Sequence, residues 1–434
     1  MKVLKKQLFA GVAALALTGA SLSVSGTAIA DPVADFYKSK RVTFIISAGT
    51  GGGYSTYSRT FIHYMKNHMP GNPTIRPTHM QGAGGIVAAN HMFNRAKRDG
   101  TVMVMIHRGA VSTVPLYHKG GGIKYDPSKF TWLGSIDTSS SFCVAWHTSA
   151  LNTANDLKKV PFVAGGLGPG ANTDIFSHLL NNMFGTKIQL ITGYGSGDAI
   201  NLAMERGEID GRCSWSIGSI RATRGPWLRD KKIKFLLEIG LKKSGAVPGI
   251  PLIMDFVKNK RDKQILELLL AAQLMGRPIL APPGIPKTRV AALRKAFDAT
   301  VRDKAFVKQM TTIGLGVDSM PGKKIEDLLV RIYATPKDII ESAGQVTKRT
   351  SKTKVTVKKS SLKTVDITLT GTKRGGRRLF FKVKGAAHKV KVSGSRTKVF
   401  LGGKKTKRKN LKVGMKCAVT YAGNGAEAKS VKCK

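Results

Sequence analysis

Residues 49–55, Gly-Thr-Gly-Gly-Gly-Tyr-Ser, follow an apolar segment rich in β-branched residues at 41–47 and precede a helical pattern at 54–69. A second glycine-rich stretch, Gly-Ala-Gly-Gly at 82–85, stands between a strand pattern at 74–80 and a helical pattern at 85–95. Glycine lets the backbone turn tightly and approach a ligand closely, and the following helix presents N–H groups and a positive dipole end. The sequence therefore predicts two backbone cradles for a small anion.

Strands and helices continue to alternate as far as about residue 345. A continuous apolar strand is expected at 101–106, and the order strand, glycine turn, helix recurs at 160–184 and again at 189–206. Such alternation indicates a parallel sheet covered by helices on both faces, with ligands bound beyond the carboxyl ends of the strands. Because the later strands carry glycine loops of their own, we expect two α/β lobes with the ligand between them.

Other chemistries that use glycine loops are excluded by spacing. Gly53 is followed by Tyr54 rather than by the Lys-Ser/Thr of a phosphate-binding P-loop, and Val87 stands where a dinucleotide fingerprint needs its third glycine. The nine histidines lack the spacing of a zinc site, and no G-x-S-x-G nucleophile motif occurs. The sequence predicts a binding protein without cofactor or metal, not an enzyme. For any single loop, the alternative is that its glycines only allow a tight turn between strand and helix.

The first 30 residues have the pattern of a signal peptide. Lysines at positions 2, 5 and 6 precede a mostly apolar segment at 8–24, and Ala28-Ile29-Ala30 offers a cleavage site. An uncleaved membrane anchor is the alternative, but small and polar residues interrupt the apolar segment. No later segment has the length and apolarity of a membrane span. We therefore expect a soluble mature protein in the periplasm.

The charge of the chain is concentrated at its end. The chain has 434 residues with 72 Lys and Arg against 25 Asp and Glu, and residues 346–434 contain 27 of those cations and two acids. We expect a linker at 346–353 and a separate basic module at 354–434, a small all-β domain of OB-like or SH3-like size. The strands expected in it cover 354–357, 365–370, 379–383, 388–392 and 398–401. Its charge serves either solubility or contact with an anionic membrane or polymer; export argues against nucleic acid as a partner in that compartment.

The four cysteines fit an oxidising compartment. Cys417 and Cys433 flank a predicted hairpin whose turn contains Asn424-Gly425, so we expect them to form a disulfide. Cys143 and Cys213 are candidates for a second pair, with two buried thiols as the alternative.

The order and spacing of several short motifs carry a family resemblance. The motifs are Gly51-Gly52-Gly53, Pro70-Gly71-Asn72-Pro73, Gly82-Ala83-Gly84-Gly85, Asp99-Gly100-Thr101, Gly168-Pro169-Gly170, Gly207-Glu208-Ile209-Asp210 and Ala281-Pro282-Pro283-Gly284-Ile285-Pro286. With them, residues 1 to about 345 resemble the Bug-type substrate-binding receptors of tripartite tricarboxylate transporters in Gram-negative bacteria. Each motif is weak alone, and the set together is specific.

The resemblance implies a type II-like, two-lobed periplasmic binding fold, or Venus flytrap, that closes over a small carboxylate. Lobe one would comprise residues 31–129 and 276–345, and lobe two residues 130–275. The ligand contacts implied from lobe one are Ala48, Gly51, Gly52, Gly53, Tyr54, Ser55, Gly82, Ala83, Gly84 and Gly85. Those implied from lobe two are Gly168, Asn172, Thr173, Asp174, Tyr194, Ser196 and Asp198.

Some residues depart from the family pattern or lie outside it. Tyr54-Ser55 stands where many relatives have Thr-Asp, and Asp198 stands where proline is frequent. Because an acid beside the ligand would repel a second carboxylate, a hydroxylated, amine-bearing or monocarboxylic ligand is as plausible as a tricarboxylate. Arg108, at the end of a strand, is our candidate for a direct ion pair with the ligand, its alternative being a solvated loop arginine.

Two functions follow as hypotheses. The first is an extracytoplasmic receptor that captures an organic carboxylate and delivers it to membrane permease subunits. The alternative is an envelope-associated adaptor or ligand sensor held at anionic surfaces by its basic module.

Overall fold

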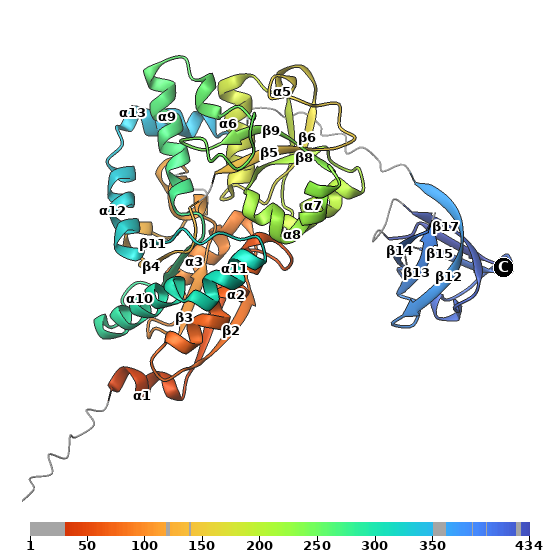
Figure 1. Ribbon diagram of the computed structural model, residues 1–434, viewed down its shortest axis with the longest axis horizontal. Coiled ribbons are helices and arrows are strands. Elements are labelled where there is room, and N and C mark those ends of the chain that lie inside the picture. Colours follow the sequence, from red (N-terminus) through yellow and green to blue (C-terminus); the bar gives the residue numbers. More distant parts are fainter. Residues whose placement is uncertain are drawn as a thin grey trace, which may run out of the picture.

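The structure, a computed structural model, describes residues 31–118, 122–138, 140–349, 362–383, 385–395, 397–421 and 427–434. The predicted signal peptide, half of the predicted linker, the strand expected at 354–357 and the predicted turn at Asn424-Gly425 lie outside these residues. Figure 1 shows two α/β lobes followed by a β-rich tail, as the sequence predicts. Within the described parts, no helix has both the length and the apolarity needed to cross a membrane.

Lobe one is built on a six-stranded sheet in the order β11-β4-β10-β3-β1-β2. Its strands are β1 (Arg41–Ile46), β2 (Thr74–His79), β3 (Val102–Met105), β4 (Thr131–Ser135), β10 (Pro278–Ala281) and β11 (Met320–Pro321). Its helices are α1 (Pro32–Lys38), α2 (Gly53–His68), α3 (Ile86–Asn94), α4 (Val114–Tyr117), α10 (Lys287–Arg302), α11 (Lys304–Thr312) and α12 (Gly322–Tyr333). Phe61 of α2 packs against Phe297 of α10 and Phe306 of α11, which joins three helices over one core.

The expectation of a purely parallel sheet is wrong for this lobe. Strands β1, β2 and β3 are parallel, but β10 runs antiparallel to both β3 and β4. The reason is topological, because the chain leaves lobe one through β4 and returns from lobe two through β10, in the opposite direction. The crossing after β4 lies a few residues beyond the boundary expected at 129.

Lobe two has a five-stranded sheet in the order β7-β6-β8-β5-β9. Its strands are β5 (Ser141–Trp146), β6 (Phe162–Gly165), β7 (Ile188–Ile191), β8 (Gly211–Trp215) and β9 (Ile233–Ile239). Its helices are α5 (Asp156–Lys159), α6 (Asn172–Phe184), α7 (Gly197–Glu205), α8 (Ile217–Arg229) and α9 (Lys260–Leu270). Here too the sheet is mixed, since β6 is parallel to β7 and β8 whereas β5 is antiparallel to β8 and β9.

The two lobes share part of their apolar interior. One cluster of buried side chains includes Val104 of lobe one, Phe162 of lobe two and Leu269 of α9. The last helix before the tail, α13 (Lys337–Val346), packs against α9 and α6 of lobe two and against α4 of lobe one. The lobes are therefore joined by packed helices as well as by the two crossing segments.

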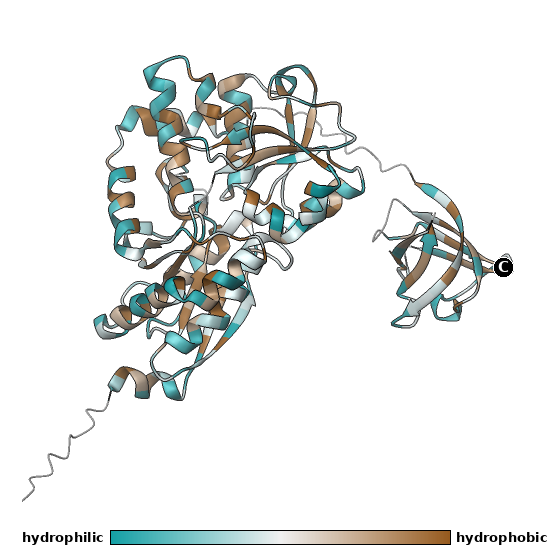
Figure 2. Cartoon of the chain, viewed as in Figure 1, coloured by the Kyte–Doolittle hydropathy of each residue, from teal (hydrophilic) through white to brown (hydrophobic). Residues whose placement is uncertain are grey.

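The tail forms one seven-stranded sheet in the order β14-β13-β12-β17-β18-β15-β16. Its strands are β12 (Lys363–Lys373), β13 (Arg378–Val383), β14 (Ala386–Lys391), β15 (Lys398–Leu401), β16 (Lys404–Lys405), β17 (Lys416–Tyr421) and β18 (Ser430–Cys433). The sheet is curled, so that the end of β14 approaches the segment before β18: the Ala428 N–H donates to the Lys391 carbonyl at 2.9 Å. Buried residues alternate with more exposed ones along β17, and Figure 2 shows both hydrophobic and hydrophilic residues in the strands of the tail. The buried side chains form an apolar core of the tail's own. This β-rich tail fits the additional all-β domain that the sequence predicts.

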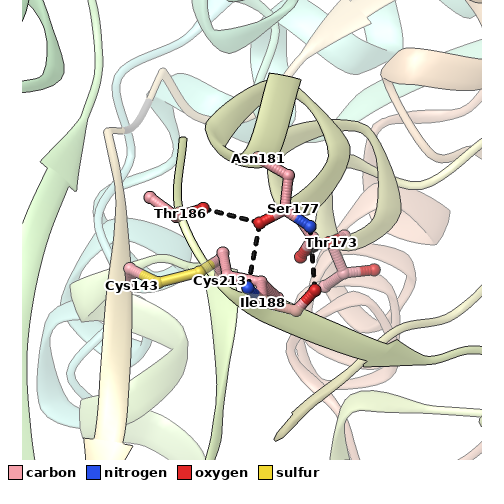
Figure 3. The surroundings of a disulfide bond; sticks show 7 residues. All are labelled: Cys143, Thr173, Ser177, Asn181, Thr186, Ile188 and Cys213. Atoms are coloured by element: carbon pink, nitrogen blue, oxygen red, sulfur yellow. Dashed lines mark hydrogen bonds between the residues drawn. A yellow bond between two sulfur atoms is a disulfide. The ribbon is translucent and has the colours of Figure 1, made fainter. Parts of the chain in front are cut away.

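Both cysteine pairs form disulfides. Cys417 of β17 and Cys433 of β18 face each other in register, as predicted, and Cys143 of β5 is joined to Cys213 of β8. The second bond lies beside α6, where Asn181 accepts hydrogen bonds from the Thr186 hydroxyl and the Ile188 N–H and so ties the end of α6 to β7 (Figure 3).

Candidate functional site

A small cavity lies between the lobes at the strand ends that carry the glycine loops. Its volume is about 70 Å³, whereas one water needs on the order of 10–15 Å³, so it admits a compact molecule. The residues that line it are Ala48, Gly52, Gly53, Tyr54, His107, Arg108, Ser141, Leu167, Ala171, Asn172, Thr173, Gly197, Asn201, Arg212, Ser214, Trp215, Ser216, Ser219, Thr223 and Arg277.

Four helices begin at this cavity. Gly52 and Ala171 are the N-cap residues of α2 and α6, and neither supplies a side-chain hydrogen bond to its helix. Gly197 starts α7, and Ser216 caps α8. The first turn of a helix leaves backbone N–H groups without intrahelical partners and carries a partial positive charge. Four such ends, two from uncapped helices, favour an anion in the space between them.

Three buried arginines add full positive charges. Arg108 follows β3 of lobe one, Arg212 lies in β8 of lobe two, and Arg277 stands in the crossing segment before β10; each is 4–5% exposed. Arg108 donates to Ser141 Oγ at 2.9 Å. Arg212 donates to the Gly197 carbonyl at 3.1 Å, and Arg277 donates to Ser219 Oγ at 2.8 Å. All these contacts are to neutral groups.

Within the described parts of the chain, no carboxylate lies within 4.0 Å of these three guanidinium groups. One nitrogen of each, Nη1 of Arg108 and Nε of the other two, is buried without a hydrogen-bond partner. Burial lowers the pKa of Arg108 to about 10; Tyr54 and the buried Asp137 oppose this lowering, and Arg277 adds to it. Burial and the neighbouring Arg224 lower the pKa of Arg212 to about 9. Since buried charges ordinarily need partners, these arginines favour an anion in the cavity.

Aromatic rings hold two of the arginines in place. Tyr54 lies 4.8 Å from Arg277, Trp215 lies 4.9 Å from Arg212, and Tyr54 also stacks on His107 at 4.3 Å. Burial, together with the charges of Arg277 and Arg108, lowers the pKa of His107 to about 3. His107 is therefore neutral, and the positive charge of the cavity comes from the arginines and the helix ends.

Seven of the residues proposed from the sequence line the cavity: Ala48, Gly52, Gly53, Tyr54, Arg108, Asn172 and Thr173. The others lie outside its lining: Gly51, Ser55, Gly82, Ala83, Gly84, Gly85, Gly168, Asp174, Tyr194, Ser196 and Asp198.

The glycine loops outside the lining make backbone contacts between the lobes. The Gly170 N–H donates to the Ala83 carbonyl at 3.1 Å, and the Gly49 N–H donates to the Gly195 carbonyl at 2.9 Å. A Cβ atom on Gly84 would lie 2.3 Å from the Ala171 nitrogen. The loop at 82–85 thus lets the backbones of the two lobes touch beside the cavity.

Two acids expected at the ligand have other partners. Asp198 forms an ion pair with Arg224 and lies against Gly51. Asp174 accepts from the Gly168 N–H and the Thr173 hydroxyl, each at 3.0 Å, and so orders the loop that precedes α6. Neither carboxylate lines the cavity, so Asp198 does not oppose a second carboxylate on the ligand as the sequence led us to expect.

The sequence reasoning missed Arg212 and Arg277. A signal was present for Arg212, because a charged residue inside a buried strand needs a reason to be there. Ser214, two residues later, adopts a left-handed backbone with φ of 65° at the cavity wall. This conformation is uncommon for a residue other than glycine and is found disproportionately at binding sites; the sequence gives no sign of it.

No family model matches the chain. A curated relative, the UPF0065 protein in the TAR-I ttuE-ttuC' intergenic region of Agrobacterium vitis, is 28% identical over 186 residues, 41% of this chain and 52% of the relative. The chain thus spans about half the length of the curated relative that it matches.

Solved structures match about 70% of the chain over nearly their whole length. The periplasmic binding protein BugD is 19% identical with a TM-score of 0.57, over 70% of this chain and 97% of BugD. MatC from Rhodopseudomonas palustris, with bound malate, is 19% identical with a TM-score of 0.55, over 69% of this chain and 99% of MatC. Rpa4515 from R. palustris, with adipate, is 16% identical with a TM-score of 0.55, over 70% of this chain and 98% of Rpa4515. The chain therefore has the two-lobed fold of the Bug-type periplasmic binding proteins, and the resemblance that its glycine motifs carry is confirmed.

Proposed function

We propose that this protein is an extracytoplasmic receptor that captures a small organic carboxylate between its lobes. The observation that carries the proposal is the convergence of Arg108, Arg212 and Arg277 on one cavity whose described lining contains no acidic residue. Guanidinium groups bind carboxylates with charge-assisted, often paired, hydrogen bonds. The four helix ends supply further donors.

The ligand that fits best is a compact molecule with two or more carboxylates. The three arginines come from lobe one, from lobe two and from the crossing segment, so they surround the cavity instead of gripping one group. An amine-bearing ligand is disfavoured, because the described lining offers no carboxylate to an ammonium group. Two relatives in fold were solved with malate and adipate, which are dicarboxylates.

The receptor would act in the periplasm with membrane permease subunits. Its fold relatives include a periplasmic binding protein, and the sequence predicts an export signal. Because both lobes contribute charge to the cavity, a bound anion favours the closed arrangement, and permease subunits can recognise closure. The adaptor or sensor alternative has no counterpart among the relatives named above.

Thermal unfolding against a panel of mono-, di- and tricarboxylates tests this function. A ligand that binds only the folded chain raises its melting temperature, and at a concentration 100 times Kd it adds about 2.7 kcal/mol. We expect compact dicarboxylates to give the largest shifts, with calorimetry yielding a single site. Shifts from sugars, amines or neutral amino acids, with none from any carboxylate, would overturn the proposal.

A further inference from the structure

The tail carries a basic hollow that has no part in the carboxylate site. Its volume is about 1010 Å³, and six of its lining residues are cationic: Arg374, Arg377, Lys405, Lys407, Arg408 and Lys409. No Asp or Glu occurs in its described lining. None of the six cations has a carboxylate within 4.0 Å among the residues that the structure describes.

The hollow is a fixed part of the fold, formed by three loops that are distant in sequence. The Val392 N–H donates to the Arg377 carbonyl at 2.9 Å, and Arg408 Nη1 donates to the Val392 carbonyl at 3.1 Å. Gly376 allows the first loop to approach the third, because a Cβ atom there would lie 2.1 Å from the Arg408 carbonyl oxygen. Arg408 therefore ties the loops together, while Arg374 and Lys407 remain exposed in the same hollow.

The lining favours phosphate groups without a nucleobase over single-stranded nucleic acid. Lys and Arg neutralise phosphates, whereas binding of single-stranded nucleic acid also uses aromatic side chains on which bases stack. The described lining has no aromatic residue. Residues 362–434 contain 21 Lys and Arg against Asp366 and Glu427, so cations also surround the hollow. This excess fits an extended anionic surface better than a single small anion.

We propose that the tail docks the protein on a membrane surface rich in anionic phospholipid, with the basic hollow at the centre of the contact. A chain with an export signal meets such surfaces, and each Lys or Arg near one contributes about a fivefold increase in affinity. The proposal does not depend on the carboxylate site, since the tail has its own core and its own disulfide.

Co-sedimentation of the full chain with phosphatidylcholine vesicles, with and without phosphatidylglycerol, tests the proposal. The triple variant Arg374→Gln, Lys405→Gln and Lys407→Gln removes three charges from the hollow. The matched variant Lys363→Gln, Lys416→Gln and Lys432→Gln removes three charges from exposed positions outside it. We expect the first to weaken binding to anionic vesicles on the order of 100-fold, and the second to weaken it less than tenfold.

Three outcomes would overturn the proposal. Equal losses from the two triple variants would mean that the charge acts diffusely and that the hollow is not the site. Equal binding to neutral and anionic vesicles would exclude recognition of phosphate charge. Tighter binding to a single-stranded oligonucleotide than to anionic vesicles at the same salt concentration would favour a nucleic acid. Unchanged melting of both variants confirms that the tail remains folded in each.

Discussion

At the scale of single residues, the three cavity arginines should strengthen ligand binding and lower the stability of the ligand-free protein. Arg212 is 4% exposed, and its partners are the Gly197 carbonyl, the Asn201 side chain and the face of Trp215. Burying a charge without a counter-ion is costly, and the proposed carboxylate ligand would offset that cost. We therefore interpret Arg212 as a residue that serves the proposed binding of a carboxylate and not folding.

Replacing Arg212 with Gln should stabilise the ligand-free protein, by on the order of 1 kcal/mol, because a buried unpaired charge disappears. The same change should weaken carboxylate binding about 10-fold to 150-fold, the equivalent of about 1.5–3 kcal/mol for hydrogen bonds to a charged group. We expect a similar loss of affinity for Arg108→Gln. Chemical denaturation without ligand and calorimetry with it measure the two effects.

Arg206→Gln is the control, since Arg206 lies in the same lobe but pairs with Glu208 outside the cavity. It should leave carboxylate affinity unchanged. Destabilisation of the ligand-free chain by Arg212→Gln would show instead that this arginine is needed for folding.

His107 makes the stability of lobe one depend on pH. Its pKa is lowered from 6.5 to about 3 by burial and by Arg277 and Arg108. Between these two pH values the unfolded chain binds a proton that the folded chain does not, so stability rises with pH in this window. We expect His107 to lower the free energy of unfolding by about 2 kcal/mol at pH 5 relative to pH 7.

Denaturation of the natural protein and of His107→Gln at the two pH values measures this contribution. Between pH 7 and pH 5, the free energy of unfolding of the variant should fall by about 2 kcal/mol less than that of the natural protein. The control His63→Gln alters an exposed histidine on α2 and should keep the full pH dependence of the natural chain. Identical acid sensitivity of His107→Gln and the natural protein would mean that His107 accepts a proton in the folded state.

At the scale of elements, strand-to-helix loops determine how closely the lobes approach. Gly84 has φ of 63° and faces the Ala171 nitrogen of the other lobe, whereas Gly185, which ends α6, has φ of 65° and nothing within 4 Å of a Cβ position. Alanine at either site costs about 1–2 kcal/mol in backbone strain. Only at Gly84 does the added methyl group also separate the lobes.

Gly84→Ala should therefore weaken carboxylate binding at least tenfold, while Gly185→Ala should leave it unchanged at a similar loss of stability. Calorimetry and denaturation of the two variants compare them directly. Equal affinities would indicate that contact between the loops at 82–85 and 168–171 is not part of the binding-competent state.

These elements also show how far the sequence determines the fold. The alternation of strand, glycine loop and helix is local, so β1, α2 and β2 follow from patterns within about 40 residues. The antiparallel course of β10 is not local, because it depends on the chain returning from lobe two. The same holds for the site: the loop at 49–55 is visible as a motif, but Arg212 and Arg277 meet Arg108 only through the assembled fold.

At the scale of the whole molecule, the lobes and the tail have separate clusters of buried side chains, and one cluster in each contains a disulfide. The tail core contains Cys417 and Cys433, whereas Cys143 and Cys213 belong to the core that lobe one and lobe two share. Cys213 lies between Arg212 and Ser214, and Cys143 lies near Ser141, so this bond fixes two cavity-lining strands relative to each other. The two disulfides should therefore affect different properties.

Replacing Cys143 and Cys213 together with Ala should lower the free energy of unfolding of the lobes by about 2–5 kcal/mol and weaken carboxylate binding as well, because β5 and β8 lose their covalent register. Replacing Cys417 and Cys433 together should destabilise only the tail and leave carboxylate affinity unchanged. Scanning calorimetry and ligand titration of both double variants separate the effects. A loss of carboxylate affinity from the tail variant would mean that the tail supports the binding lobes, and that the protein unfolds as a single unit.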